Sequence, residues 1–313
     1  MYKHQVLRNY PCVRFLSVLI LGTLVIQLRG QTHALSSYPD SVVNKRLVTV
    51  IVAKGAIFTG GMFFLGSIWY KDRERMPFHF DNDIKGHLQL DKTGHAYSAY
   101  HESRLGYQAL RWAGVNKKKA LIYGGTLGII LQAPIEIFDG LYDGQGFSAY
   151  DFAANTGGSV LFMVQQGLFD EQIILMKFSY SPSVYPTYYD KLGVNHVESF
   201  FLDYNAHTYW LSCNIRKVTG ITSIPSWLNL AVGYSGNGML GEYENVTFYK
   251  GKPVPYLERY RQFLFSLDVD FLRIRTRSKM LRTVFQYLNM FKIPFPAIEF
   301  NSKGKLGFHS VYF

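Results

Sequence analysis

The sequence predicts an α+β protein, in which an N-terminal apolar helical bundle is followed by a C-terminal antiparallel β-rich domain. Long apolar runs with helix-compatible spacing fill residues 45–176. Residues 177–313 instead alternate short apolar and polar stretches between Gly, Pro and Asn turns. Aromatic residues make up 16% of the 313 residues, which suits strands, interfaces and the headgroup regions of membranes.

The composition excludes several classes of protein. With 48% hydrophobic and 18% charged residues, the chain is not a disordered polymer. Its two cysteines, Cys12 and Cys213, are too few for a disulfide framework, a zinc ribbon or an iron–sulfur site. The formal charge of +11 accompanies no helix-turn-helix, ribonucleoprotein motif or zinc finger, so no nucleic-acid partner is expected.

The N-terminal segment has the pattern of a secretory signal. Residues 1–14 contain Lys3, Arg8 and Arg14 but no acid, and an apolar run over residues 15–28 follows. A small residue suited to cleavage, Ala34, comes shortly afterwards. We therefore expect a signal peptide over residues 1–34, with a retained signal anchor as the alternative, and hence an exported protein.

Three further apolar runs predict helices. Residues 47–70 reach membrane-spanning length at about 1.5 Å per residue, although Lys54 and several glycines interrupt them. Residues 120–138 and 153–169 carry polar groups that hydrocarbon would not tolerate unpaired. We expect three or four helices packed together in or on a membrane with their polar residues facing one another. A soluble bundle with a very apolar core is the alternative.

Polar residues recur at helical spacing within and between these runs. His87, Asp91 and His95 are four residues apart and are expected to share one helix face. The next two predicted helices each carry a polar pair three or four residues apart. The candidate site residues are Asp91, His95, Glu136, Asp139, Asp151 and Asn155.

Burying any of these side chains alone would cost several kcal/mol, so they are expected to converge in a polar centre. Such a centre could bind a divalent metal through Asp91, His95 and Glu136, or act as an acid/base pair. A purely structural role is favoured over both, because Ser148 precedes Asp151 in a capping-box pattern. A divalent metal is therefore possible but not favoured, no cofactor-binding residue is identified, and the cofactor stays unknown.

These residues resemble a known family. The segments that carry the resemblance are residues 78–83, Asp91-Lys92-x-Gly94-His95-Ala96, Glu136-x-x-Asp139-Gly140 and Ser148-x-x-Asp151-x-x-Ala154-Asn155-x-x-Gly158. They resemble the YfiM-like family of predicted periplasmic (lipo)proteins of unknown function and, more distantly, the VanZ-like membrane family. The resemblance covers residues 45–170 approximately. It implies a bacterial cell-envelope protein, periplasm-facing and membrane-associated, and assigns no role to any residue.

The second half predicts a half-buried sheet. Alternating strands are expected over residues 200–204, 207–214, 227–234, 259–270 and 307–313, with an amphipathic helix near residues 277–291. A small sheet domain is favoured over an outer-membrane barrel, because a barrel needs about eight strands. The choice between outer and inner membrane stays open.

These observations favour a non-enzymatic envelope protein, a structural or binding module for a membrane lipid, a glycan or an envelope protein. The sequence lacks a Gly-x-Ser-x-Gly nucleophile motif. The competing hypothesis is an envelope lipid- or cell-wall-modifying enzyme that uses the Asp/His/Glu centre. The sequence carries no prediction of oligomeric state.

Overall fold

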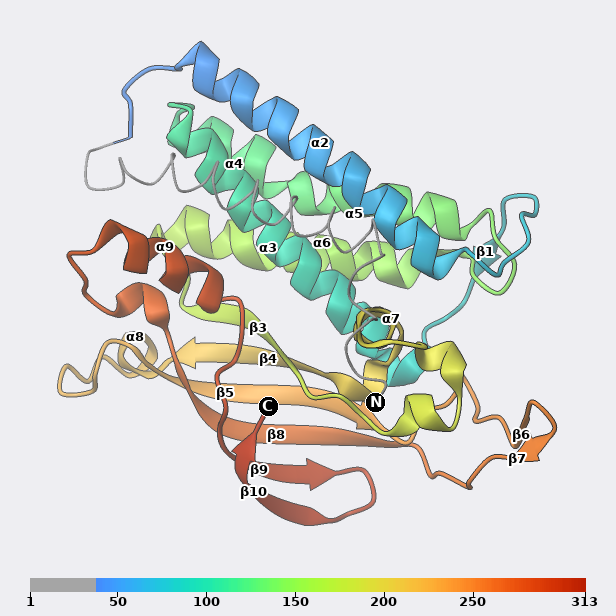
Figure 1. Cartoon of the computed structure of the whole chain (residues 1–313). Helices are drawn as coiled ribbons and strands as arrows, with labels where there is room; N and C mark the ends of the chain where they lie inside the picture. Colours follow the sequence, from blue (N-terminus) through green and yellow to red (C-terminus); the bar gives the residue numbers. More distant parts are fainter. Residues whose placement is uncertain (1–37) are drawn as a thin grey trace, which may run out of the picture.

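The computed structural model describes residues 38–313, so the predicted signal segment lies outside the described residues. Helices form one layer and an antiparallel sheet forms the other, as the predicted α+β class requires (Figure 1). The helical layer contains α2 (Asn44–Trp69), α3 (Leu90–Trp112), α4 (Lys117–Gly125), α5 (Leu127–Asp139) and α6 (Ala149–Phe169). In Figure 1, α2 lies on the side of this layer away from the sheet. All three predicted apolar helices are confirmed, with the second divided at Thr126.

The sheet has the strand order β10-β9-β8-β5-β4-β3, and all neighbours are antiparallel. Its strands are β3 (Ile174–Tyr180), β4 (His207–Asn214), β5 (Leu228–Asn237), β8 (Tyr260–Val269), β9 (Phe295–Asn301) and β10 (Leu306–Tyr312). Shorter elements lie outside these layers or connect them: β1 (Phe80–Asp81) with β2 (Phe147–Ser148), β6 (Phe248–Tyr249) with β7 (Lys252–Pro253), α7 (His196–Leu202), α8 (Ile215–Thr219), α9 (Lys279–Leu288) and several 3₁₀ turns.

The strand predicted over residues 200–204 is wrong. The chain there forms the end of α7 and then a 3₁₀ turn, η4 (Tyr204–Ala206). Asn195 starts α7 by accepting hydrogen bonds from the backbone N–H groups of Val197 and Glu198. This cap selects a helix where the near-alternation of apolar and polar residues predicts a strand. The predicted amphipathic helix is confirmed as α9.

Helix α3 belongs to both layers. It packs against α2, α4, α5 and α6 on one side, and against β3, β4 and β5 on the other. On its sheet side, the ring of Tyr97 lies 5.8 Å from that of Phe178 and 5.9 Å from that of Tyr209. His101 Nε2 lies 2.9 Å from the carbonyl oxygen of Met176 on β3. Side chains of α3 are therefore held from both sides.

Two glycines bring α5 and α6 close to the backbone of α3. A Cβ atom at Gly128 would lie 2.2 Å from the carbonyl oxygen of Ala99, and one at Gly158 would lie 2.0 Å from that of Ala96. The adjacent Gly157 has no atom within 4 Å of its Cβ position. Gly158, and not Gly157, therefore allows the close packing of α6 on α3.

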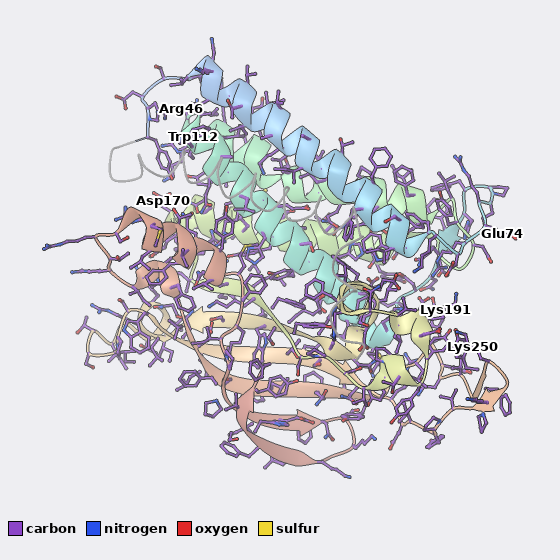
Figure 2. The ribbon with its side chains drawn as sticks, in the orientation of Figure 1. Arg46, Glu74, Trp112, Asp170, Lys191 and Lys250 are labelled. Carbon is purple, nitrogen blue, oxygen red and sulfur yellow. The ribbon has the colours of Figure 1, made fainter. Side chains whose placement is uncertain are left out.

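Within the described residues, two helical stretches are long and apolar enough to cross a membrane, by length and composition: residues 44–69, and residues 117–139 taken through Thr126. Only 17% and 33% of their apolar windows are buried inside the protein. The start of α2 is fixed to the end of α3, where Arg46 donates to the carbonyl oxygen of Trp112 at 3.2 Å and stacks over its ring (Figure 2). Most residues of both windows are thus at least partly exposed.

The sheet is half-buried as its alternation predicts, but its polar face is the buried one. On β8, Asp268 is fully buried and accepts a hydrogen bond from Ser212 at 2.6 Å. The ammonium of Lys177, also fully buried, lies 2.7 Å from the same carboxylate. The alternate residues of β8 point outward, and Phe265 is 48% exposed.

The exposed apolar face is continuous from strand to strand. The register places Val232, Phe265, Ile298 and Phe308 side by side across β5, β8, β9 and β10, and all four are exposed. Helix α9 likewise buries polar residues and exposes apolar ones. Thr283 and Asn289, the residue that follows the helix, are buried, whereas Val284 and Leu288 on the opposite side are exposed.

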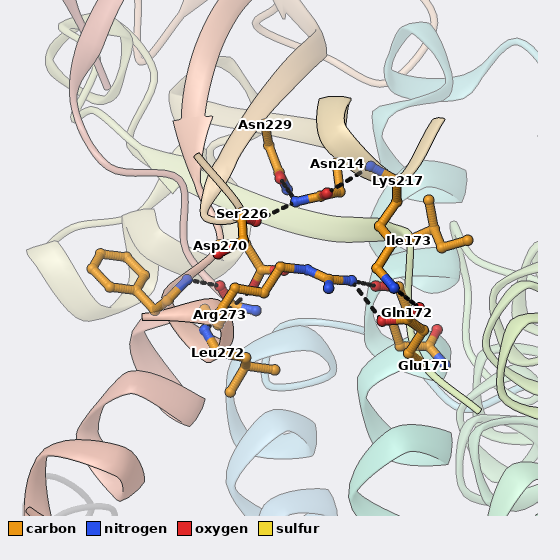
Figure 3. A network of polar contacts seen from close by, with 12 residues as sticks. Glu171, Gln172, Ile173, Asn214, Lys217, Ser226, Asn229, Asp270, Leu272 and Arg273 are labelled. Carbon is orange, nitrogen blue, oxygen red and sulfur yellow. Dashed lines mark hydrogen bonds and ion pairs between the residues drawn. The ribbon is translucent and has the colours of Figure 1, made fainter. Parts of the chain in front are cut away.

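A polar network joins the end of α6 to the sheet (Figure 3). Arg273 donates to the carboxylate of Glu171 at 3.1 Å and to that of Asp270 at 2.9 Å. Glu171 also pairs with Lys217 on α8. Asn214 at the end of β4 donates to Asn229 on β5 at 2.8 Å. These contacts fix one end of the helical layer to the sheet.

Candidate functional site

The segment before α3 differs from the predicted helix. His87 does not share a helix face with Asp91 and His95, because α3 begins at Leu90. His87, Leu88 and Gln89 have positive φ values of 43°, 53° and 65°, which are strained for residues with side chains. The backbone N–H of His87 donates to the carbonyl oxygen of Glu242 at 2.9 Å. This left-handed turn places the His87 ring 4.5 Å from that of Tyr204, in the wall of the site cavity.

His95 lies at the centre of the converged residues. Its Nδ1 is 3.2 Å from Asn155 Oδ1 on α6 and 3.4 Å from Glu136 Oε1 on α5. Its Nε2 is 3.8 Å from Asp91 Oδ1, one helical turn earlier on α3. Asp151 lies one turn before Asn155 on α6, where its backbone N–H donates to Ser148 Oγ at 3.0 Å. Five of the six candidate residues therefore surround one point, and the Ser148 cap is present as well.

The sixth candidate, Asp139, lines the same cavity but has a different partner. It accepts a hydrogen bond of 2.6 Å from the hydroxyl of Tyr70, the residue that follows α2. Helix α2 is thereby linked to the site by a side chain that the spacing of polar residues could not reveal.

Lys92 and Tyr204 are central residues that were not among the sequence candidates. The Lys92 ammonium pairs with Asp83, with Asp91 at 3.2 Å and with Asp151 at 2.9 Å. The Tyr204 hydroxyl donates to Asp91 Oδ1 at 2.6 Å from 113 residues away. The position of Lys92 next to Asp91 in the sequence could have identified it as a site residue, because a buried acid needs a positive partner. Nothing in the sequence marks Tyr204.

The site separates the pKa values of its acids. Burial opposes the charge on Asp91, but His95, Lys92 and the Tyr204 hydroxyl together hold its pKa below the usual range. Burial and the neighbouring Asp91 raise the pKa of Asp151 to about 7. Burial raises the pKa of Glu136 to about 8, against the opposing effect of His95. At neutral pH, Asp91 is thus ionised and Glu136 is protonated.

His95 itself favours the charged form. Burial lowers the pKa of the imidazole, but the neighbouring Asp91, Asp151 and Glu136 outweigh it and raise the pKa to about 9. An imidazolium next to an ionised carboxylate can donate a proton to a bound group or hold a negatively charged atom.

Two cavities meet at this centre. The first, of about 250 Å³, is lined largely by polar residues and includes His87, Asp139 and Asp151. The second, of about 320 Å³, lies between α3 and the sheet and is lined largely by aromatic residues such as Tyr97, Phe178 and Phe200. The residues common to both walls are Trp69, Asp91, His95, Ile135, Phe201 and Tyr204.

Asp91, His95 and Asp151 could hold a metal ion. One potential ligand atom from each lies within 4.8 Å of those of the other two. Glu136, which the sequence placed with Asp91 and His95, lies instead on the Nδ1 side of the His95 ring. Cavity walls that combine acids, an imidazole and an apolar chamber could bind a cation or an amphiphilic molecule.

Residues 79–166 match the family model described as "Predicted periplasmic lipoprotein (DUF2279)". The matched segment contains α3, α4, α5, most of α6 and all six candidate residues. No curated protein and no solved structure matches the chain. The match supports the prediction of an envelope protein facing the periplasm and assigns no activity to the site.

Proposed function

We propose that this chain is a YfiM-like, membrane-associated envelope protein that binds an amphiphilic envelope molecule, a lipid or a lipid-linked glycan. The observation that carries the proposal is the junction of the polar and aromatic cavities at Asp91 and His95. An amphiphile would place its polar head among the acids and its apolar part among the aromatic rings. The more distant VanZ-like resemblance rests on the same polar spacing.

The outward apolar surfaces support membrane association. A sheet in water normally buries its apolar face, whereas here Asp268 is buried and Phe265 is exposed. Apolar residues facing out and polar residues facing in are typical of a sheet in contact with lipid. The exposed Val284 and Leu288 of α9 and the outer surface of α2 add to the same apolar exterior. Lipid next to these surfaces would supply the amphiphile.

Blocking the aromatic cavity tests ligand binding. Ser98 lines this cavity, so Ser98→Trp is expected to fill much of it and to lower binding of a fluorescent lysophospholipid by at least about tenfold. Ser223→Trp, at an exposed position in the α8–β5 connection, is the matched control. Native mass spectrometry of the detergent-purified chain would detect a co-purified amphiphile. Equal binding by the two variants, with nothing co-purified, would contradict the proposal.

A lipid- or cell-wall-modifying enzyme is the second candidate. It is favoured by His95, whose Nε2 faces Asp91 at the junction of the cavities while its Nδ1 contacts the buried Glu136. The isosteric variants Asp91→Asn and Glu136→Gln should then abolish the cellular function at normal protein abundance. Lost function together with low abundance would indicate a structural role for these residues instead.

A further inference from the structure

We infer that Asp91, His95 and Asp151 bind a divalent cation at the wall of the polar cavity. The three side chains come from two neighbouring helices, and one potential ligand atom of each lies within 4.8 Å of the others. Asp91 and His95 are one turn apart on α3, and Asp151 is in the first turn of α6. The inference stands apart from the amphiphile proposal, because it depends on these ligand atoms alone.

The orientation of His95 fits a metal ligand. Nδ1 faces Asn155 Oδ1 at 3.2 Å and Glu136 Oε1 at 3.4 Å. A ligating histidine characteristically uses its second nitrogen in this way, donating to an amide or carboxylate oxygen that fixes the ring. The other nitrogen, Nε2, is 3.8 Å from Asp91 Oδ1, too far for a hydrogen bond. It therefore faces a carboxylate at a separation that leaves room for a shared ion.

The carboxylates near His95 have more acceptor capacity than the protein uses. Within the described residues, Glu136 Oε1 and Asp151 Oδ1 accept no well-aligned hydrogen bond, although both side chains are at most 5% exposed. Each has a single ion-pair contact, Glu136 Oε1 with His95 Nδ1 at 3.4 Å and Asp151 Oδ1 with the Lys92 ammonium at 2.9 Å. Lys92 is the nearest cation to Asp151, at 2.9 Å, and it also neutralises Asp83 and Asp91. When His95 is neutral, as a ligating histidine must be, one ammonium against three carboxylates leaves two negative charges, which a divalent ion would balance. Without the ion, the protonated His95 supplies part of this balance.

The ligand set indicates the class of ion. One imidazole with two carboxylates offers both nitrogen and oxygen, which suits Mn²⁺ or Zn²⁺ better than an all-oxygen site for Mg²⁺ or Ca²⁺. Asp91 would ligate through Oδ1, where the Tyr204 hydroxyl orients it at 2.6 Å. The open cavity of about 250 Å³ leaves space for water or a ligand on the remaining coordination positions.

Metal titration of the full chain in detergent tests the inference. After treatment with a chelator and buffer exchange, Mn²⁺ binding would be followed by electron paramagnetic resonance, with Zn²⁺ as the competitor. We expect one saturable site, with affinity lowered at least about 100-fold in His95→Gln and Asp151→Asn. Glu242→Gln is the matched control, because it removes a charge from the same cavity wall outside the ligand group. It should change affinity by less than about fivefold.

Asn155→Ala keeps all three ligands and removes the oxygen that orients His95, so affinity should fall by about 10- to 100-fold. This variant keeps the inference testable if a ligand variant does not fold, which circular dichroism would show. Absence of saturable binding to the folded parent chain would overturn the inference. Equal losses in Glu242→Gln and Asp151→Asn would also overturn it, because they would indicate diffuse charge attraction. Lysophospholipid binding by the metal-free chain would leave the amphiphile proposal intact.

Discussion

Lys177 and Asp268 form an ion pair inside the sheet with no exposure to solvent. The ammonium also donates to the carbonyl oxygen of Val269 at 2.7 Å, and the carboxylate accepts from Ser212 at 2.6 Å. Such a pair is only weakly stabilising compared with apolar residues of the same size, because both charges lose their hydration. Removing one partner is much more damaging, because the other charge then stays buried alone.

Lys177→Met should therefore lower the free energy of unfolding by about 3–5 kcal/mol. The double variant Lys177→Met/Asp268→Leu should recover a large part of this loss, because no uncompensated charge remains. Chemical unfolding of the single variants and the double variant in one detergent would measure the coupling. A double variant no more stable than Lys177→Met would contradict this account of the buried pair.

Lys292 gives a pH-dependent prediction. It is 5% exposed and lies over the ring of Trp210, and burial lowers its pKa to about 8. An unfolded lysine has a pKa of about 10.4, so the unfolded chain binds more protons between pH 8 and pH 10.4. The unfolding free energy of the parent should rise relative to Lys292→Met across this interval, by on the order of 2 kcal/mol, and the difference should be constant below pH 8. Paired unfolding curves at pH 7, 8, 9 and 10 would check the sign; a flat difference would refute it.

At the scale of elements, the contact between α3 and α6 depends on a missing side chain. Gly158→Ala would force a methyl group against the carbonyl oxygen of Ala96 and should cost about 1–3 kcal/mol of stability. Gly157→Ala is the adjacent control, with open space at its Cβ position, and should gain up to about 1 kcal/mol from helix propensity. Thermal unfolding of both variants distinguishes them. Similar melting temperatures would mean that the two helices can separate at little cost.

The elements also show what the sequence could predict. The apolar runs predicted helices whose ends lie near the observed ones. The strand His207–Asn214 was predicted with the bounds that the structure shows. β3 was missed because Ile174–Tyr180 straddles the expected boundary at residue 177. The four-residue spacing correctly predicted that Asp91 and His95 share one face of a helix. It failed at His87, where tertiary contacts hold three residues in a left-handed turn that no local rule favours.

Alternation alone could not decide which face of the sheet is buried. In residues 263–270 the pattern separates acids from apolar residues, and it reads the same whether lipid or protein covers the apolar face. The partner of Asp91 was equally hidden, because Tyr204 reaches it only through the packing of the two layers.

At the scale of the whole molecule, many apolar side chains are exposed, while the buried face of the sheet holds ion pairs and amides beside an apolar cluster around Trp210 and Leu264. The double variant Phe265→Arg/Phe300→Arg places two charges on the exposed apolar face. If lipid covers this face, each would cost up to about 2–4 kcal/mol, and the protein should be released by alkaline carbonate and float less with liposomes. Ser223→Arg, in an exposed connection, should remain bound. Equal retention of the two proteins would show that this face does not contact lipid.

The position of α3 between two layers has a consequence for modularity. The family match ends at residue 166, before β3, yet Leu90, Tyr97 and His101 of α3 are covered by side chains or backbone of the sheet. A chain that carried only the matched segment would expose this face and lose the Tyr204 hydroxyl from Asp91. The polar centre of this chain is therefore complete only when the C-terminal sheet covers α3.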